Sequence, residues 1–249
     1  MSDQDQQPIL FSIDGALAHI VLNRPEVKNA GNVAMLQAIH DAVAAIEESS
    51  AEILILSSTS ENFSSGADLR ESRVSPPELA RERVTLLHRV LGRLRELDIP
   101  VIAALDGVVV GLGSELAISA DIRIVADNTV FFYPEAKVGV PSPSHRLVAT
   151  IGLARAQDML LTGRRVHADE AIEWGLATRR AADPKAAAAE LAEQLLAFST
   201  HALHETKRGL RRCVAFAAAE DSLKHIEGVS NAAYTAQRTQ ALADFAARS

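Results

Sequence analysis

Gly111-Leu112-Gly113-Ser114-Glu115-Leu116 places a carboxylate inside a short apolar helix that two glycines introduce. A carboxylate among apolar neighbours costs free energy unless it has a partner or a chemical task. A second glutamate lies 20 residues later, at the end of Phe131-Phe132-Tyr133-Pro134-Glu135, where a predicted strand ends. Two neighbouring carboxylates are able to divide acid and base roles between them. Glu115 and Glu135 are therefore our candidate catalytic residues.

Strands and helices alternate on both sides of these glutamates. Apolar runs around Asp14-Gly15 predict a hairpin, and Ser75-Pro76-Pro77-Glu78 is typical of the start of a long helix. The expected strands are 9–13, 18–23, 53–56, 101–105, 122–126 and 130–133, and the expected helices before residue 150 are 33–48, 75–97 and 111–120. From about Gly152 the pattern is almost wholly helical, over 152–162, 168–175, 184–199, 202–219 and 222–247. This order predicts an α/β core followed by a helical C-terminal part.

Composition bounds the class of protein. The chain has 249 residues and a formal net charge of −7, which suits one large α/β domain and offers no basic block for nucleic acid. Its single cysteine, Cys213, rules out an intrachain disulfide. Residues 1–8 are polar and acidic, so we expect a flexible N-terminus and no signal peptide. With no apolar run of about 18 residues, we expect a cytoplasmic protein without nucleic-acid or membrane partners.

The segment 63–69 contains Ser-Ser-Gly after a predicted strand. Gly66 permits a positive φ, so the turn is able to present the backbone N–H of Ala67 to a carbonyl oxygen. The alternative is an ordinary strand-to-helix turn in which Asp68 caps the next helix. The segment by itself leaves both interpretations open.

The stretch 106–115 also has two interpretations. A helix that begins after Gly111 offers unpaired N–H groups and the positive end of its dipole, which would stabilise a thioester enolate. The rival is a dinucleotide fingerprint, G-x-G-x-x-G, with Asp127 as a ribose-binding acid, although Leu116 occupies the third glycine position. The histidines show no metal-ligand spacing and no G-x-S-x-G is present, so neither a metal site nor a hydrolase triad is predicted.

Several motifs, in this order, resemble the enoyl-CoA hydratase/isomerase (crotonase) superfamily from about Ile9 to about Arg248. They are 22–30, 63–69, 100–107, 111–121, 134–139, 160–163 and 168–176. The resemblance implies an α/β crotonase fold, in which a spiral of ββα units at 9–190 carries a CoA-thioester site and a helical region at 191–249 mediates trimerisation. It also implies a homotrimer or a homohexamer built as a dimer of trimers.

The resemblance assigns site residues motif by motif. Ala67 and Leu112 match the two backbone N–H donors of the family's oxyanion hole, and Glu115 and Glu135 match its acid/base glutamates. The CoA part of the substrate is expected along 24–30 and the turn at 67–69. The residues expected to bind substrate or CoA are Arg24, Lys28, Ala30, Gly66, Asp68, Leu69, Gly113 and Pro141. No cofactor is implied, because coenzyme A is part of the acyl-CoA thioester substrate.

Members that keep both glutamates typically add water across a 2-enoyl-CoA double bond, so the resemblance favours a hydratase. Glu135 is then the proton donor to C2, and both glutamates hold the water. Isomerases generally keep only the later glutamate. The chain departs from the family pattern at Leu112, where most relatives have glycine, and at 142–145, where their glycine-rich turn is longer. Isomerisation, C–C cleavage, decarboxylation and a CoA-ester-binding subunit without turnover therefore stay open as alternatives.

Overall fold

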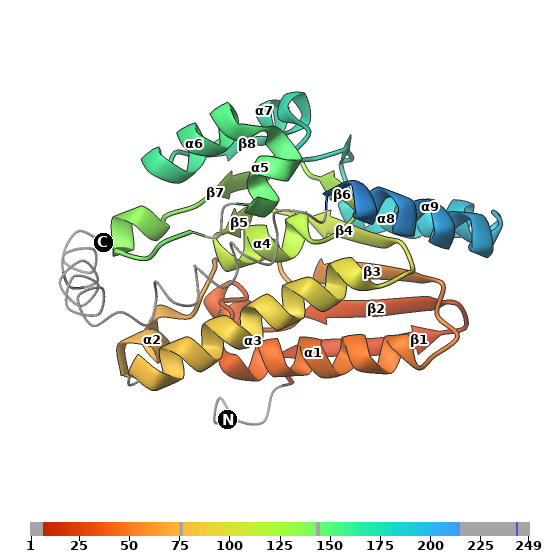
Figure 1. Ribbon diagram of the computed structural model, residues 1–249, viewed down its shortest axis with the longest axis horizontal. Helices are drawn as coiled ribbons and strands as arrows, with labels where there is room; N and C mark the ends of the chain where they lie inside the picture. Colours follow the sequence, from red (N-terminus) through yellow and green to blue (C-terminus); the bar gives the residue numbers. More distant parts are fainter. Residues whose placement is uncertain (1–6, 75–76, 143–144, 215–242, 244–249) are drawn as a thin grey trace.

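The computed structural model describes residues 7–74, 77–142, 145–214 and residue 243. Figure 1 shows the arrangement of the elements. In chain order they are β1 (Ile9–Asp14), β2 (Leu17–Leu22), η1 (Pro25–Val27), α1 (Val33–Glu47), β3 (Ile53–Ser58), α2 (Leu69–Val74), α3 (Pro77–Glu96), β4 (Val101–Leu105), β5 (Val108–Val110), α4 (Leu112–Ile118), β6 (Ile122–Val125), β7 (Val130–Phe132), η2 (Glu135–Val138), α5 (His145–Ile151), α6 (Leu153–Thr162), β8 (Val166–His167), α7 (Ala168–Trp174), β9 (Arg179–Arg180), α8 (Pro184–Leu196) and α9 (Thr200–Val214).

The strands form two sheets that the chain visits in turn. The larger sheet has the order β1-β2-β3-β4-β6-β9, and the smaller has the order β5-β7-β8. Strand β4 of the larger sheet leads into β5 of the smaller through Asp106 and Gly107, whose φ of +55° makes the turn possible. Strands β6 and β7 divide between the sheets in the same way. Repetition of this path builds the predicted spiral of ββα units.

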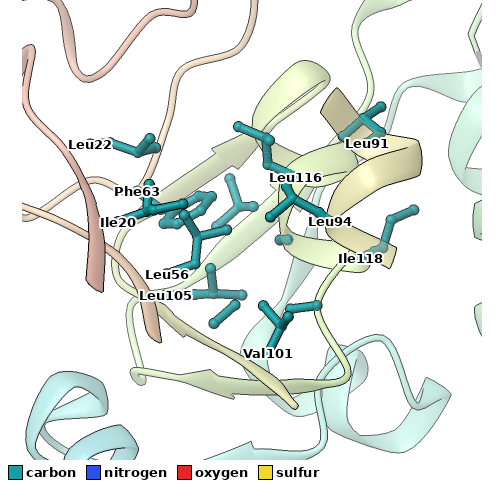
Figure 2. Packing of buried hydrophobic residues seen from close by; sticks show 14 of the residues in the cluster. Ile20, Leu22, Leu56, Phe63, Leu91, Leu94, Val101, Leu105, Leu116 and Ile118 are labelled. Atoms are coloured by element: carbon teal, nitrogen blue, oxygen red, sulfur yellow. The ribbon is translucent and has the colours of Figure 1, made fainter. Parts of the chain in front are cut away.

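Strand β3 is buried on both faces, as its unbroken apolar sequence predicts for a central parallel strand. Ile53 and Ile55 join the apolar cluster that includes α8, whereas Leu54 and Leu56 join the main core. Figure 2 shows that main core, where side chains of β2, β3 and β4 meet those of α3 and α4. Helix α4, which carries Glu115, is therefore fixed by the core itself.

Helices cover both faces of the larger sheet. Helices α1 and α3 run side by side along the main core (Figure 1), and α8 packs on the other face through Ala188, Leu191 and Ala192. The boundary predicted between residues 190 and 191 falls within α8. Among the residues that the structure describes, no helix has both the length and the apolar character needed to cross a membrane.

Most expected elements are confirmed, including the hairpin of β1 and β2. The expectation of an almost wholly helical part after Gly152 is wrong at two places. Strand β8 pairs antiparallel with β7, and β9 pairs parallel with β6. Two residues are too few to leave a periodic pattern in the sequence, so only the pairing reveals these strands. The helix expected over 202–219 is described up to Val214, and the one over 222–247 falls, apart from residue 243, on residues whose structure is not described.

Candidate active site

Gly111 joins β5 to α4 in a backbone conformation, with φ 47° and ψ −109°, that residues with a side chain rarely adopt. Its N–H donates to the carbonyl of Phe132 at 3.0 Å, which holds the end of β5 against β7. A Cβ atom at Gly111 would lie 2.3 Å from Oε1 of Glu135. The missing side chain therefore allows the Glu135 carboxyl to approach the start of α4.

Ala67 and Leu112, the predicted oxyanion-hole residues, line one cavity. The N–H of Gly31 donates to the carbonyl of Gly66 at 2.7 Å, and the carbonyl of Gly31 accepts from the N–H of Asp68 at 2.9 Å. In such a parallel bridge the N–H of the residue between them, Ala67, points away from Gly31. Leu112 begins α4, so its N–H has no acceptor within the helix. Both N–H groups are thus placed to donate to a ligand.

The Leu112 side chain, at the position where most relatives have glycine, contacts the segment that contains Gly31. It packs toward Gly31, where an added Cβ would lie 2.9 Å from Cδ2 of Leu112. Because the positive φ falls on Gly111, Leu112 itself has a helical backbone that any side chain tolerates. The leucine therefore packs against Gly31 at the edge of the cavity and leaves the backbone N–H in place.

Glu115 is fully buried and bonded through both carboxyl oxygens. Nε of Arg146 donates to Oε2 at 2.8 Å, and the hydroxyl of Tyr133 donates to Oε1 at 3.0 Å. Glu115 is 1% exposed and Arg146 is 4% exposed, so solvent screens this ion pair little. Burial raises the pKa of Glu115 above its usual value, against the Arg146 cation and the two hydrogen bonds. The guanidinium has donors only and the tyrosine hydroxyl is placed to donate, which is the geometry expected around a carboxylate.

Glu135 begins the short helix η2, and its surroundings are the opposite of those of Glu115. Within the described part of the chain, its Oε2 is buried without a hydrogen-bond partner. Burial raises the pKa of Glu135 to about 7, opposed by its own backbone N–H and reinforced by the negative charge of Glu115. A carboxyl with this pKa is able to give or take a proton near neutral pH.

Both glutamates open onto one cavity of about 600 Å³, the size of a small-molecule site. Residues of α1, α2, α3 and η2 and of the segment after η2 contribute to its apolar wall. The apolar lining includes Leu36, Leu69, Val84, Leu87, Val138, Val140 and Pro141, and the charged lining is Arg83, Glu115, Glu135, Lys137, Arg164 and Arg165. The cavity therefore combines an apolar wall with a carboxyl pair and two backbone donors, which suits a carbonyl compound with an apolar chain.

Three of the residues predicted to bind CoA hold each other in place. Nη1 of Arg24 donates to the Ala30 carbonyl at 2.5 Å and to Oδ2 of Asp68 at 3.1 Å. Oδ1 of Asp68 accepts from the N–H of Arg70 at 3.1 Å, so Asp68 also caps α2 as its alternative interpretation predicts. None of the three lines the cavity. They join segment 24–30 to the turn at 67–69.

The remaining predicted CoA residues divide between the cavity and its surroundings. Gly66, Leu69 and Pro141 line the cavity. Lys28 is exposed, in a left-handed conformation with φ 51°, and its carbonyl accepts from Ser65 N–H at 2.8 Å. Gly113 lies behind the cavity, where an added Cβ would be 2.6 Å from Cβ of Ser64, so it permits close packing of α4.

Arg146 is the site residue that sequence reasoning missed. It follows the turn at 142–145 in an ordinary Arg-Leu pair, and no spacing rule links it to Glu115, 31 residues earlier. The available signal was indirect: a carboxylate predicted inside an apolar helix needs a cationic partner. Only the packing of α5 against α4 identifies that partner.

The dinucleotide alternative finds no support in the geometry. Asp127, the proposed ribose-binding acid, is exposed and paired with Arg180. Helix α4 spans only seven residues, and its start faces Glu135. In the described part of the chain, no group of three or more His, Cys, Asp or Glu side chains is placed to hold a metal ion.

Comparison with known proteins finds similarity to enoyl-CoA hydratases and isomerases along most of the chain. The model of the family described as enoyl-CoA hydratase/isomerase matches residues 12–246. A putative enoyl-CoA hydratase/isomerase of Bacillus subtilis, YngF, is 35% identical over 212 residues, which cover 82% of this chain and 82% of that protein. An enoyl-CoA isomerase/hydratase of Zymoseptoria tritici is 36% identical over 173 residues, or 66% of this chain. The chain spans only 56% of the length of that relative.

Solved structures agree at the level of the fold. An enoyl-CoA hydratase/isomerase from Mycobacterium paratuberculosis is similar with a TM-score of 0.85 and 26% identity. The match covers 95% of this chain and 99% of that one.

Proposed function

Since this chain belongs to the enoyl-CoA hydratase/isomerase (crotonase) family, we propose that it adds water syn across the double bond of a 2-enoyl-CoA. The observation that best supports this proposal is that two glutamates line one cavity but have different electrostatic surroundings. Glu115 has a cationic partner in Arg146. Glu135 has no ion-pair partner within the described part of the chain, and its pKa is about 7. One carboxylate and one carboxylic acid on the same cavity are the pair that hydration requires.

The thioester carbonyl binds first in this mechanism. The N–H groups of Ala67 and Leu112 donate to its oxygen and polarise the conjugated double bond. Each well-aligned donor lowers the barrier by about 3–4 kcal/mol, since negative charge develops on that oxygen as the enolate forms. The positive end of the α4 dipole lies at the same place and adds to this stabilisation.

Water adds between the two carboxyl groups. Each oxygen of Glu115 keeps a lone pair after accepting from Arg146 or Tyr133, so the carboxylate is able to accept a hydrogen bond from water. The water oxygen bonds to C3 and its proton passes to Glu115, while protonated Glu135 delivers its proton to C2. Proton transfer from Glu115 back to Glu135 restores the starting state. Addition is syn because both groups act from one side of the double bond.

Isomerisation of the double bond is the second candidate, and a specific observation favours it. Both oxygens of Glu115 already accept from fixed donors, and the Arg146 cation lowers the basicity of the carboxylate. If Glu115 is thereby too weak a base for water, Glu135 alone moves a proton between C2 and C4 of the same enolate. The oxyanion hole serves both reactions equally.

The binding of CoA and the assembly are also proposed here. Segment 24–30 and the turn at 67–69 are tied together by the Arg24–Asp68 ion pair and by the hydrogen bond from Ser65 to Lys28. This continuous surface is adjacent to the predicted oxyanion hole, and exposed Lys28 is its candidate phosphate contact. A homotrimer, or a hexamer formed as a dimer of trimers, is the assembly that the family resemblance favours.

The test follows the ultraviolet absorbance of the conjugated enoyl thioester with crotonyl-CoA and a longer 2-enoyl-CoA. For a hydratase, Glu115→Gln and Glu135→Gln each slow the loss of absorbance by about 10²–10⁴-fold. Glu190→Gln, on the exposed side of α8, is the matched control and keeps its rate. Far-ultraviolet circular dichroism checks that each variant is folded.

A 3-enoyl-CoA separates the two candidates, because its isomerisation creates the conjugated absorbance. If Glu115→Gln retains this activity and neither wild type nor variant hydrates crotonyl-CoA, the protein is an isomerase. If neither substrate is turned over but CoA esters raise the melting temperature, it is a binding subunit.

A further inference from the structure

We propose that Arg146 is a positioning residue, which keeps Glu115 ionised and thereby leaves the exchangeable proton of the glutamate pair on Glu135. The inference rests on the proposed function, since it assigns the acid and the base of that same site. It adds the residue that sets this division between the two glutamates, and that residue lies outside both glutamate motifs.

The guanidinium of Arg146 is held on three sides. Nε donates to Glu115 at 2.8 Å, Nη1 contacts Nε2 of His145 at 2.8 Å, and Nη2 contacts Nδ1 of His88 at 3.2 Å. A guanidinium has donors only, so each histidine accepts at the contacting nitrogen. Helices α3 and α5 thus fix the cation, and the cation fixes the carboxylate on α4.

This arrangement decides which glutamate is neutral. Two carboxylates on one cavity disfavour double ionisation, so near neutral pH one of them holds a proton. Of the two glutamates, the cation is bonded to Glu115, and Glu135 has a buried oxygen without a partner in the described part of the chain. Tyr133 contributes in the same direction, because its hydroxyl donates to Glu115. Ionisation of Glu115 therefore requires less free energy than ionisation of Glu135.

Arg95, on α3, is a further charged group near this cluster. It is half-buried, and burial lowers its pKa, as does the neighbouring Arg146 cation, while Glu115 raises it. Arg95 is thus close enough to stabilise Glu115 through space. No hydrogen bond joins Arg95 to Glu115 among the described residues, which makes Arg95 a matched control for the direct contact.

A purely structural role for Arg146 makes a different prediction. A structural arginine would tie α5 to α4, and its loss would lower stability without moving the proton. The discriminating measurement is therefore the position of the proton. Infrared difference spectroscopy near pH 6 on protein labelled with ¹³C-glutamate reports the C=O band of a protonated glutamate, and Gln variants assign it.

With Arg146 present, we expect the band to disappear in Glu135→Gln and to persist in Glu115→Gln. In Arg146→Gln the assignment reverses, so that Glu115→Gln removes the band and Glu135→Gln leaves it. Arg146→Lys and Arg95→Gln keep the wild-type assignment. We also expect Arg146→Gln to lose turnover about as much as Glu115→Gln, with no further loss in the double variant.

The proposal is overturned if the wild-type band survives Glu135→Gln, a comparison that leaves Arg146 intact and does not depend on a destabilised variant. It is equally overturned if Arg146→Gln keeps the wild-type assignment. The spectra need no substrate, so they separate this inference from the proposed reaction. If the assignment of the band reverses in Arg146→Gln but no enoyl-CoA is turned over, the role of Arg146 stands and the proposed hydratase activity is rejected.

Discussion

Replacing Glu135 by glutamine should stabilise the protein at alkaline pH while it abolishes catalysis. Burial and the charge of Glu115 raise the pKa of Glu135 from 4.5 to about 7. The folded state therefore binds the proton more tightly than the unfolded state, and wild type loses stability as pH rises from the unfolded pKa through the folded one. At about 1.36 kcal/mol per pKa unit, the full penalty above pH 7 is about 3 kcal/mol.

Urea denaturation at several pH values between 4 and 8.5 measures this penalty. The quantity to follow is the difference in unfolding free energy between Glu135→Gln and wild type, because any packing cost of the amide is the same at every pH. We expect this difference to change by about 3 kcal/mol in favour of the variant between pH 4.5 and 8. Glu190→Gln, which removes a carboxyl from the exposed side of α8, controls for the change in net charge. A difference independent of pH would refute the reasoning and would deprive Glu135 of its role as an acid at neutral pH.

Two further changes test the geometry of the site. Gly111→Ala should lower turnover by at least about 10²-fold, because its Cβ would lie 2.3 Å from Oε1 of Glu135. Gly152 has a φ of +80°, but no atom lies within 4 Å of an added Cβ, so Gly152→Ala should lower stability and leave the rate unchanged. Equal rates in the two variants would contradict this. Asp68→Asn should lower stability by about 1–2 kcal/mol at neutral pH, because it removes the charge that pairs with Arg24, although the asparagine oxygen is still able to cap α2. Burial opposes ionisation of Asp68, but hydrogen bonds from arginines outweigh it and lower its pKa below 3.8. The stability difference between wild type and Asp68→Asn should therefore shrink as pH falls below about 3.8 and through this lowered pKa. Thermal melts at pH 7 and pH 3 measure it, and a difference that is undiminished in acid would contradict the prediction.

Local pattern was enough to find most of the site. Gly111, Glu115 and Glu135 stand in motifs whose chemistry is visible in a short window, because a glycine pair before a helix and a carboxylate among apolar residues are both costly without a reason. The turn at 63–69 was ambiguous for the opposite reason. A serine-glycine turn with an aspartate after it is common, and the structure shows that Asp68 is indeed a cap while Ala67 lines the cavity.

The parts that were missed depend on contacts between distant segments. Strands β8 and β9 have two residues each and exist only through their partners β7 and β6. Arg24 and Asp68 were assigned to CoA as separate residues, yet 44 positions apart they form an ion pair. A basic side chain beside a predicted binding turn has the same sequence signature whether it contacts a phosphate or a carboxylate of its own chain.

The amino-acid sequence thus determines most of the helices and strands, the two turns that precede the predicted backbone donors, and the presence of two glutamates at a fixed separation, because each of these features is encoded in short segments. The tertiary structure alone decides how the two glutamates differ. Arg146 reaches Glu115 by the packing of α5 on α4, and Gly111 allows the approach of Glu135, which has no ion-pair partner among the residues that the structure describes. Electrostatic energy depends on distance and burial rather than on sequence separation, so the proton's place in this pair becomes visible only once the chain is folded.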